Sequence, residues 1–310
     1  MPGCCLSTFN QNIFSWNSAS VTNMQLPSMR RACAVFVGAT LRLLSTNATR
    51  MANGPSVVYI KASDVAACIG KNSFKTPSEM LDEYWKRYSP STFVGLTKLQ
   101  EQLLAVQRMP EVEKQVLIRA VETQTVSATE MNQLLESTAN KILSSPLMSA
   151  DDKEKVLAVL TGTLQTGLGT RTEDVIAQKV AAQEQVTLEK DVKIYRLPLI
   201  KLGGTRYVLR GKIDRLQPEG DEVVLVEIKS RVRKLFNSLR EYENIQVQAY
   251  LQLLPPQLRI HRARLIEQFE DERNSFSIVR DDALWSGQLL PALVTFCSEL
   301  DKAMKQQWPS

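Results

Sequence analysis

Residues 211–229 read GKIDRLQPEGDEVVLVEIK, and this stretch decides the fold. Asp214 ends one run of apolar and basic residues, and Glu227 and Lys229 end the next run, with turn-forming residues at 218–221 between them. The pattern predicts two strands joined by a tight turn, with Glu227 and Lys229 on one face because strand positions two apart project together. If the two strands pair, Asp214 falls beside them. Two carboxylates at one end of a sheet are hard oxygen ligands of the kind that suits Mg²⁺ or Mn²⁺.

A divalent cation at this place would stabilise the charge that develops on a phosphodiester and would lower the pKa of a bound water. Lys229 beside it can orient or deprotonate that water and can offset the phosphate charge. Each motif alone has a plainer explanation, because Glu-x-Lys is usually a solvated pair and Gly-x-x-Asp is common beside turns. Two apolar strands that both end in charges, one after the other, favour a catalytic site.

Two further features flank these strands. Glu173 precedes them in a predicted helix, and Thr170-Arg-Thr-Glu173 also has the spacing of a capping box, which would explain the glutamate without any function. Both interpretations stay open. Gln246 and Tyr250 are four residues apart in a predicted helix, so they share one face. They either support the site or form the polar edge of an amphipathic helix.

The connection between the second strand and this helix is basic. It carries, with no acid among them, Lys229, Arg231, Arg233, Lys234 and Arg240. Such a run is usually a solvated face, but here it adjoins the candidate metal site, where a phosphate backbone needs neutralising. We expect these residues to contact nucleic acid.

The remaining pattern predicts a mixed α/β core with an N-terminal helical addition. Apolar residues at spacings of three and four predict helices throughout 96–165, and Gly167-Leu-Gly-Thr170 is interpreted as a break before the next helix. Further helices are expected over 61–69, from 77 onward, and over 171–186, 235–254 and 282–305. Strands are expected over 192–200, 205–214, 222–229, 259–267 and 275–280.

The net positive charge belongs to the N-terminal segment. The chain has 310 residues, with 38 Lys plus Arg against 33 Asp plus Glu, a formal charge of +5. Residues 1–63 contain no acid and five basic residues, so the rest carries 38 − 5 = 33 basic and 33 acidic residues and is formally neutral. This arithmetic excludes a protein that coats nucleic acid through its overall charge.

Residues 1–55 have the composition of a mitochondrial transit peptide, rich in Ser, Thr and Asn with scattered arginines, so we expect a targeting peptide or disordered leader and a mitochondrial location. The alternatives are a secretory signal starting at Met29, or an untranslated leader joined to a protein that starts at Met51, in which case the location is nuclear or cytoplasmic. The single apolar run is too short to span a bilayer, so no membrane partner is expected. In every case the folded domain covers 56–310.

Together, Glu173, Gly211-x-x-Asp214, Glu227-x-Lys229 and Gln246-x-x-x-Tyr250 resemble the PD-(D/E)xK nuclease superfamily, in particular its RecB-like branch. The opening segments 61–70 and 74–85 resemble those of YqaJ-type viral recombinases and lambda-exonuclease-like proteins. These motifs sample the chain from about residue 60 to 255. The resemblance implies a restriction-endonuclease-like core, with a mixed central sheet flanked by helices and an N-terminal helical subdomain or insertion.

The resemblance also implies roles for the residues that match its motifs. Asp214 and Glu227 would ligate Mg²⁺, with the Ile228 carbonyl as an additional ligand, and Mn²⁺ would be able to substitute. Lys229 would activate the attacking water. Glu173 would complete the acidic cluster, through water or a second metal.

The supporting residues match the family less completely. Gln246 and Tyr250 would support the site and touch the DNA strand, and Ser63 matches a position that contacts a terminal phosphate. Relatives commonly place a Trp and an Arg shortly before that serine, and residues 53–59 contain neither, which puts 5′-phosphate recognition and strict 5′-end polarity in doubt. The helical segment 91–166 is longer than the typical connection. It is interpreted as an insertion that gates the DNA path or binds a partner.

The expected function is a Mg²⁺-dependent DNA nuclease, an exonuclease or end-processing enzyme of DNA repair or recombination. The alternative is a catalytically weak nucleic-acid-binding protein that kept the fold, which the intact acid–acid–lysine set disfavours. A third is a structural or protein-interaction protein in which the motifs are coincidental. Besides DNA, the expected partners are a second copy of the chain or a protein that binds the helical insertion.

Overall fold

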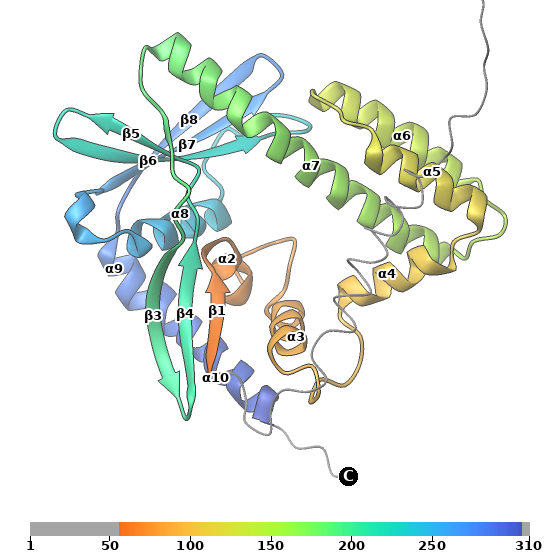
Figure 1. Ribbon diagram of the computed structural model, residues 1–310, viewed down its shortest axis with the longest axis horizontal. Coiled ribbons are helices and arrows are strands. Elements are labelled where there is room, and N and C mark those ends of the chain that lie inside the picture. The colour runs from red at the N-terminus through yellow and green to blue at the C-terminus, as the bar shows by residue number, and fades with distance from the viewer. Residues whose placement is uncertain (1–55, 306–310) are drawn as a thin grey trace, which may run out of the picture. The chain divides into compact units, whose positions relative to one another are not determined.

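The structure, a computed structural model, describes residues 56–305. The N-terminal segment 1–55, for which a targeting role is predicted, lies outside the described residues. The described part consists of two β-sheets with helices packed on them and a group of helices that extends away from them (Figure 1).

The smaller sheet has the strand order β1–β4–β3. β1 (Val57–Lys61) runs parallel to β4 (Thr205–Gly211), and β4 pairs antiparallel with β3 (Tyr195–Leu202). One face of this sheet is apolar and packs on α8 (Glu241–Leu253) and α10 (Leu290–Lys305), forming the largest core cluster. The residues that alternate with these apolar positions are exposed or half-buried.

The larger sheet has five strands in the order β2–β5–β6–β7–β8. β5 and β6 form an antiparallel hairpin, and β7 pairs parallel to β6, so α8 is the crossover between them. Leu225 on β6 faces the α8 side, whereas Val226 and Ile228 face α7. The strands are β2 (Glu189–Lys190), β5 (Arg215–Glu219), β6 (Glu222–Ser230), β7 (Arg262–Phe269) and β8 (Glu272–Val279).

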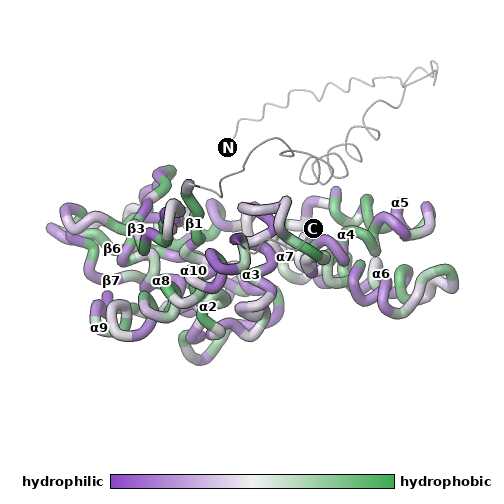
Figure 2. The backbone as a smooth tube through the Cα atoms, turned by 90° about the horizontal axis from the view of Figure 1, so that it is seen from below, coloured by the Kyte–Doolittle hydropathy of each residue, from purple (hydrophilic) through white to green (hydrophobic). Residues whose placement is uncertain are grey.

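The predicted mixed α/β core with N-terminal helices is confirmed. Figure 2 shows hydrophilic and hydrophobic stretches alternating along the helices, and no helix within residues 56–305 is long and apolar enough to cross a membrane.

The remaining helices are η1 (Ala62–Asp64), α2 (Val65–Cys68), α3 (Pro77–Tyr88), α4 (Lys98–Arg108), α5 (Glu111–Glu122), α6 (Ala128–Leu143), α7 (Ala150–Glu184), η2 (Pro256–Leu258), α9 (Asp282–Leu284) and the π-helical turn η3 (Trp285–Leu289).

The long helix α7 connects the helical part to the sheets. Its first half packs on α4 and α6 through buried residues four apart, from Val156 to Leu168. Its second half places Ile176 and Val180 on β6. In Figure 1 this helix runs from the larger sheet to α4 without interruption.

The predicted break at 167–170 is therefore wrong, and so is the predicted start of a helix at Arg171. The Thr170 hydroxyl donates to the Thr166 carbonyl (3.0 Å), as inside a helix, so Thr170 and Glu173 do not form a capping box. Each glycine costs about 1 kcal/mol in a helix. The apolar stripe on both sides outweighs that cost, because each fully buried Leu or Val contributes roughly 1.5–3 kcal/mol. The predicted segment boundary at residue 166 falls inside this helix.

Most other predicted elements are present with shifted ends. The strand predicted over 222–229 is β6, and those predicted over 192–200, 259–267 and 275–280 are β3, β7 and β8. The predicted turn at 218–221 joins β5 and β6, and a second tight turn joins β3 and β4. Gly220 and Gly203 lie in these turns at φ of 60° and 55°, the left-handed region that glycine adopts without strain.

Three differences bear on the site. The strand predicted over 205–214 ends at Gly211, because the chain changes sheets there. The helix predicted over 235–254 begins at Glu241, because the preceding residues are held as a loop by side chains described below. The short strands β1, β2 and β5 were not predicted.

Replacing Gly169 by Ala tests the continuity of α7. A Cβ at Gly169 meets nothing within 4 Å, so the substitution is expected to raise the free energy of unfolding by about 0.5–1 kcal/mol through the helix propensity of Ala. Urea denaturation followed by circular dichroism measures this change. Gly70→Ala is the matched control and is expected to lower the free energy of unfolding, because Gly70 has a φ of 75° and Ala is strained there. A neutral or destabilising effect of Gly169→Ala would contradict a continuous helix.

Candidate active site

The bend between β4 and β5 positions Asp214. β4 belongs to the smaller sheet and β5 to the larger one, so the chain passes from one sheet to the other over residues 212–214. The Ile228 amide of β6 donates to Asp214 Oδ2 (2.9 Å). Since Arg215 pairs with Val226, the next position outward, Asp214, lies opposite Glu227. The predicted proximity of Asp214 to the Glu-x-Lys strand is present.

Glu227 and Lys229 lie on the α8 side of β6 and meet the side chains of that helix. Lys229 Nζ donates to Glu227 Oε1 (2.6 Å) and to Gln246 Oε1 (3.2 Å). Gln246 Nε2 in turn donates to Glu227 Oε1 (2.9 Å) and to the Tyr250 hydroxyl (3.1 Å). The four predicted residues therefore form one hydrogen-bonded group.

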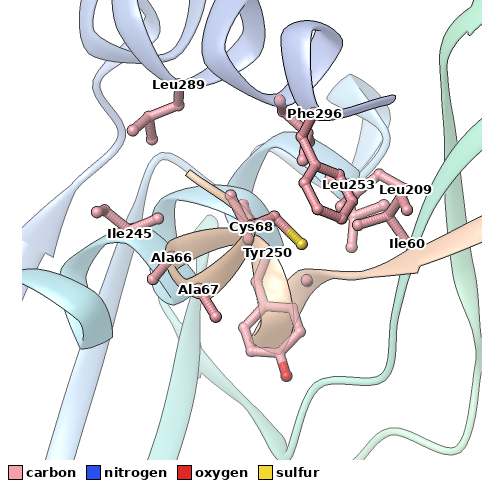
Figure 3. Packing of buried hydrophobic residues seen from close by; sticks show 14 of the residues in the cluster. Ile60, Ala66, Ala67, Cys68, Leu209, Ile245, Tyr250, Leu253, Leu289 and Phe296 are labelled. Carbon is pink, nitrogen blue, oxygen red and sulfur yellow. The ribbon is translucent and has the colours of Figure 1, made fainter. Parts of the chain in front are cut away.

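Gly211 allows α8 to approach the bend closely. A Cβ at this position would lie 2.7 Å from Leu253 Cδ1 and 2.8 Å from Tyr250 Cε1, too close for any side chain without movement. Figure 3 shows Tyr250 packed among the apolar residues of the core with its hydroxyl at the edge of the cluster. Burial raises the pKa of Tyr250, and nearby Glu227 adds to the effect, so its hydroxyl stays protonated.

The carboxyl groups of Asp214 and Glu227 lie close together, and the neighbouring groups do not fully compensate their negative charge. Glu227 is 3% exposed, and its Oε2 is buried with no hydrogen-bond partner among the described residues. Burial and the adjacent Glu227 charge raise the pKa of Asp214 to about 8. Burial alone would lower the pKa of Lys229, but Glu227 and Asp214 raise it overall, so this lysine is an ammonium.

These observations fit a divalent cation. A buried carboxylate oxygen without a partner, beside a second carboxylate whose charge is disfavoured, is the arrangement that a hard cation stabilises. Asp214, Glu227 and the Ile228 carbonyl are the oxygen donors that this bend brings together. Within residues 56–305 there is no group of three or more Asp, Glu, His or Cys side chains arranged around one metal position.

Glu173, the third predicted acid, is paired with a cation beside Asp214, and its charge contributes to the raised pKa of Asp214. Arg215 is 3% exposed and its Nη1 donates to Glu173 Oε1 (2.7 Å) and to the Asp214 carbonyl (2.6 Å). Its Nη2 pairs with Asp174. Arg215 therefore links α7 to the bend that carries Asp214. Sequence reasoning missed this residue, because its burial on β5 and its partners on α7 become visible only in the fold.

The basic run is divided between structural and exposed residues. Arg231 forms ion pairs with two buried acids, Glu243 at the start of α8 (2.7 Å) and Glu267 on β7. The Phe236 amide donates to Glu267 Oε2 (3.0 Å), and Arg231 and Arg240 lie over the Phe236 ring at 4.6 and 3.8 Å from its centroid. Arg231 therefore has a structural role, with its Nε and Nη2 bonded within the protein, and its predicted contact with nucleic acid stays a prediction.

The other predicted contact residues are accessible. Arg233, Lys234 and Arg240 are exposed on the loop that Arg231 and Phe236 hold. Ser63 is exposed in the turn η1, which packs on α8, the helix of Gln246 and Tyr250.

Comparison with known proteins agrees with this geometry. The family model described as "PD-(D/E)XK nuclease superfamily" matches residues 96–277, more than half of the chain. The chain belongs to the PD-(D/E)XK nuclease superfamily. The superfamily predicted from the motifs is thereby confirmed, and the two sheets with flanking helices are its restriction-endonuclease-like core.

Solved structures show a distant similarity. The alkaline exonuclease LHK-Exo of Laribacter hongkongensis has 15% identity and a TM-score of 0.34, over 60% of this chain and 86% of that one. The structure titled SSO0001 has 14% identity and a TM-score of 0.33, over 62% of this chain and 87% of that one. At this level neither bears on what the chain does. No curated protein matches.

The raised pKa of Asp214 makes a prediction about stability. A carboxyl that is more easily protonated in the folded state stabilises the fold at low pH, and this stability is lost as pH rises from about 4 towards about 8. Without divalent metal at pH 8, Asp214→Asn is expected to be more stable than wild type by about 1–3 kcal/mol. The difference should disappear at pH 4 and shrink with saturating Mg²⁺. Thermal melting measures it.

Asp282→Asn is the control for this experiment. Hydrogen bonds from Gln252 and Arg280 lower the pKa of Asp282, so its replacement should reduce stability at pH 8. If Asp214→Asn has a lower melting temperature than wild type at pH 8 without metal, then repulsion between Asp214 and Glu227 does not destabilise the metal-free fold, and the account of the two carboxylates is wrong.

Proposed function

We propose that this protein is a metal-dependent DNA nuclease that hydrolyses phosphodiester bonds at the bend between β4 and β5. The observation that carries the proposal is the partnerless, buried Glu227 Oε2 beside Asp214, with Lys229 on the same strand. A protein that only bound nucleic acid would have no use for a buried acid, Glu227, beside a half-buried one, Asp214, whose like charges repel each other.

Asp214, Glu227 and the Ile228 carbonyl would hold the divalent cation, Mg²⁺ with Mn²⁺ able to substitute. When bound, the cation supplies charge neutralisation at the phosphate and a more acidic water. Glu173 would complete the acidic cluster through a water or a second metal. Its Oε1 accepts from Arg215, which leaves Oε2 for this role.

Lys229 acts as a donor in this proposal. Its ammonium, held by Glu227 and Gln246, would hold the attacking water by hydrogen bonding and would offset negative charge on the phosphate. The raised pKa disfavours a neutral amine that takes the proton from water before metal binds. Gln246 and Tyr250 position Lys229 and Glu227 from α8.

The substrate class and the cellular role are inferred from the N-terminal part of the chain. The resemblance of segments 61–70 and 74–85 to lambda-exonuclease-like proteins supports an exonuclease or end-processing activity in DNA repair or recombination. The exposure of Ser63 in η1, beside α8, supports its predicted contact with a terminal phosphate. The composition of residues 1–55 supports a mitochondrial location.

The helical segment supports a role in the path of the substrate. A groove of about 830 Å³ lies between α3, α4 and α7, with Phe74, Leu99 and Gly162 in its lining. Along α7 it extends to Thr170 and Arg171, less than one turn from Glu173. A strand in this groove would therefore lead towards the acids.

A cleavage assay tests the proposal. With Mg²⁺ or Mn²⁺, the full chain is expected to degrade linear DNA. Asp214→Asn and Lys229→Ala are expected to lower kcat by at least about a thousandfold, because each removes charge stabilisation made at the reacting phosphate. Glu222→Gln, at the exposed start of the same strand β6, is the control and should cleave like wild type.

Two results would contradict the proposal. Cleavage that survives both substitutions places the chemistry elsewhere. Binding of DNA without cleavage under any divalent metal identifies a binding protein that kept the fold.

A further inference from the structure

The outer face of the β1–β4–β3 sheet is basic and carries no acid. The strands of this sheet read VVYIK, YRLPLIKL and TRYVLRG, and contain no Asp or Glu. The face opposite the apolar core presents Lys61, Arg196, Lys201, Arg206 and Arg210, four of them exposed and Arg210 half-buried. In the described part of the chain none of these five side chains has a carboxylate partner.

The strand register places these cations side by side. Arg210 in the central strand pairs with Lys61 of β1 and with Arg196 of β3, and Arg206 pairs with Lys201. Like charges directly opposite each other destabilise a sheet. Three such pairs on one small sheet are a cost that the protein does not offset internally, and costs of this kind are expected at functional surfaces.

An aromatic ring lies among the cations. Tyr59 projects on the same face, with the guanidinium groups of Arg210 and Arg196 at 5.3 and 5.9 Å from its ring centroid. These cation–π contacts favour the two guanidinium groups near the ring, and no hydrogen bond within the described residues engages their N–H groups.

The face leads to the candidate active site. Arg210 is followed by Gly211 and the exposed Lys212, and Asp214 comes two residues later at the bend. Arg210 and the residues paired with it, Lys61 and Arg196, therefore form the end of this basic face that leads along the chain to Asp214. Arg206 lies four residues before Arg210 on β4, at a distance of about 13 Å, and Lys201 of β3 pairs with it.

We propose that this face, defined by Tyr59, Lys61, Arg196, Lys201, Arg206 and Arg210, binds the phosphate backbone of the nucleic acid beyond the cleaved bond. This inference rests on the proposed function and extends it, because it moves the main charge contact from the loop 229–240 to the sheet. The three strands span about 10 Å. A length of about 13 Å covers about four phosphates of one strand at 3.4 Å each. Phosphate contacts carry no sequence information, so the binding is expected to be independent of sequence.

The test uses the full chain and the double variant Arg196→Gln/Arg210→Gln. In the cleavage assay at about 0.1 M salt, KM is expected to rise about tenfold with kcat nearly unchanged, because contacts away from the reacting phosphate affect the ground state and the transition state alike. The slope of log KM against log salt should decrease in magnitude by about 1.5, from two lost phosphate contacts. Arg196→Lys/Arg210→Lys keeps the charges and should restore most of the affinity.

The matched control is Arg119→Gln/Lys141→Gln, which removes the same charge from exposed positions on α5 and α6. If the two double variants change KM and its salt slope equally, the effect comes from the lost net charge and not from this face, and the proposal is overturned. An unchanged KM and salt slope in the sheet variant would also overturn it. So would a variant that loses binding to phosphatidylserine vesicles while it keeps wild-type affinity for DNA, since the face would then serve a membrane surface.

Fluorescence anisotropy with labelled DNA separates this inference from the proposed function. If wild type cleaves nothing, the nuclease proposal fails, and the binding difference between wild type and the sheet variant still tests the face. If wild type cleaves and binding is the same in both, only the face is disproved.

Discussion

The site depends on a single contact, the hydrogen bond from the Ile228 amide to Asp214 Oδ2. The chain has only residues 212–214 in which to leave one sheet and enter the other, and this bond fixes the bend against β6. It places the carboxylate of Asp214 beside that of Glu227, although the two charges repel each other. Gly211 makes the arrangement possible from the other side, because any Cβ there would displace Tyr250 and with it the helix that supports Glu227 and Lys229.

Three cations pair with the acids around the site. Arg215 pairs with Glu173 and Asp174, Arg231 pairs with Glu243 and Glu267, and Lys229 pairs with Glu227. Removing one partner of a buried ion pair leaves a charge that is costly to bury, so both arginines hold their elements in place. Arg215 fixes α7 to the bend, and Arg231 fixes the first turn of α8 to β7. Among the described acids of this cluster, Glu227 has a buried carboxylate oxygen, Oε2, without a hydrogen-bond partner, which is why we assign the metal to it.

The sequence predicted the residues that meet in the site better than the elements that carry them. Strand residues two apart share a face, which predicted that Glu227 and Lys229 lie together, and helix residues four apart share a face, which predicted the same for Gln246 and Tyr250. The short turn predicted Asp214 beside Glu227. These relations were predictable because they are local in the sequence. The break assigned at Gly167 was wrong, since the apolar stripe of α7 continues at spacings of four through Leu168 and outweighs two glycines. The partners of Arg231 lie on other elements, Glu267 being 36 residues away, so a basic run could not be distinguished from a structural ion pair without the tertiary fold.

The central claim is that Asp214 and Glu227 share one divalent cation. Anomalous diffraction from crystals of the full chain soaked in Mn²⁺ tests it most directly. The account predicts a peak at about 2.2 Å from a carboxylate oxygen of each residue, with the Ile228 carbonyl as a third oxygen, and no peak at this place in Asp214→Asn. A Mn²⁺ peak bound elsewhere with Glu227 Oε2 still without a ligand, or an unchanged peak in Asp214→Asn, would contradict the account.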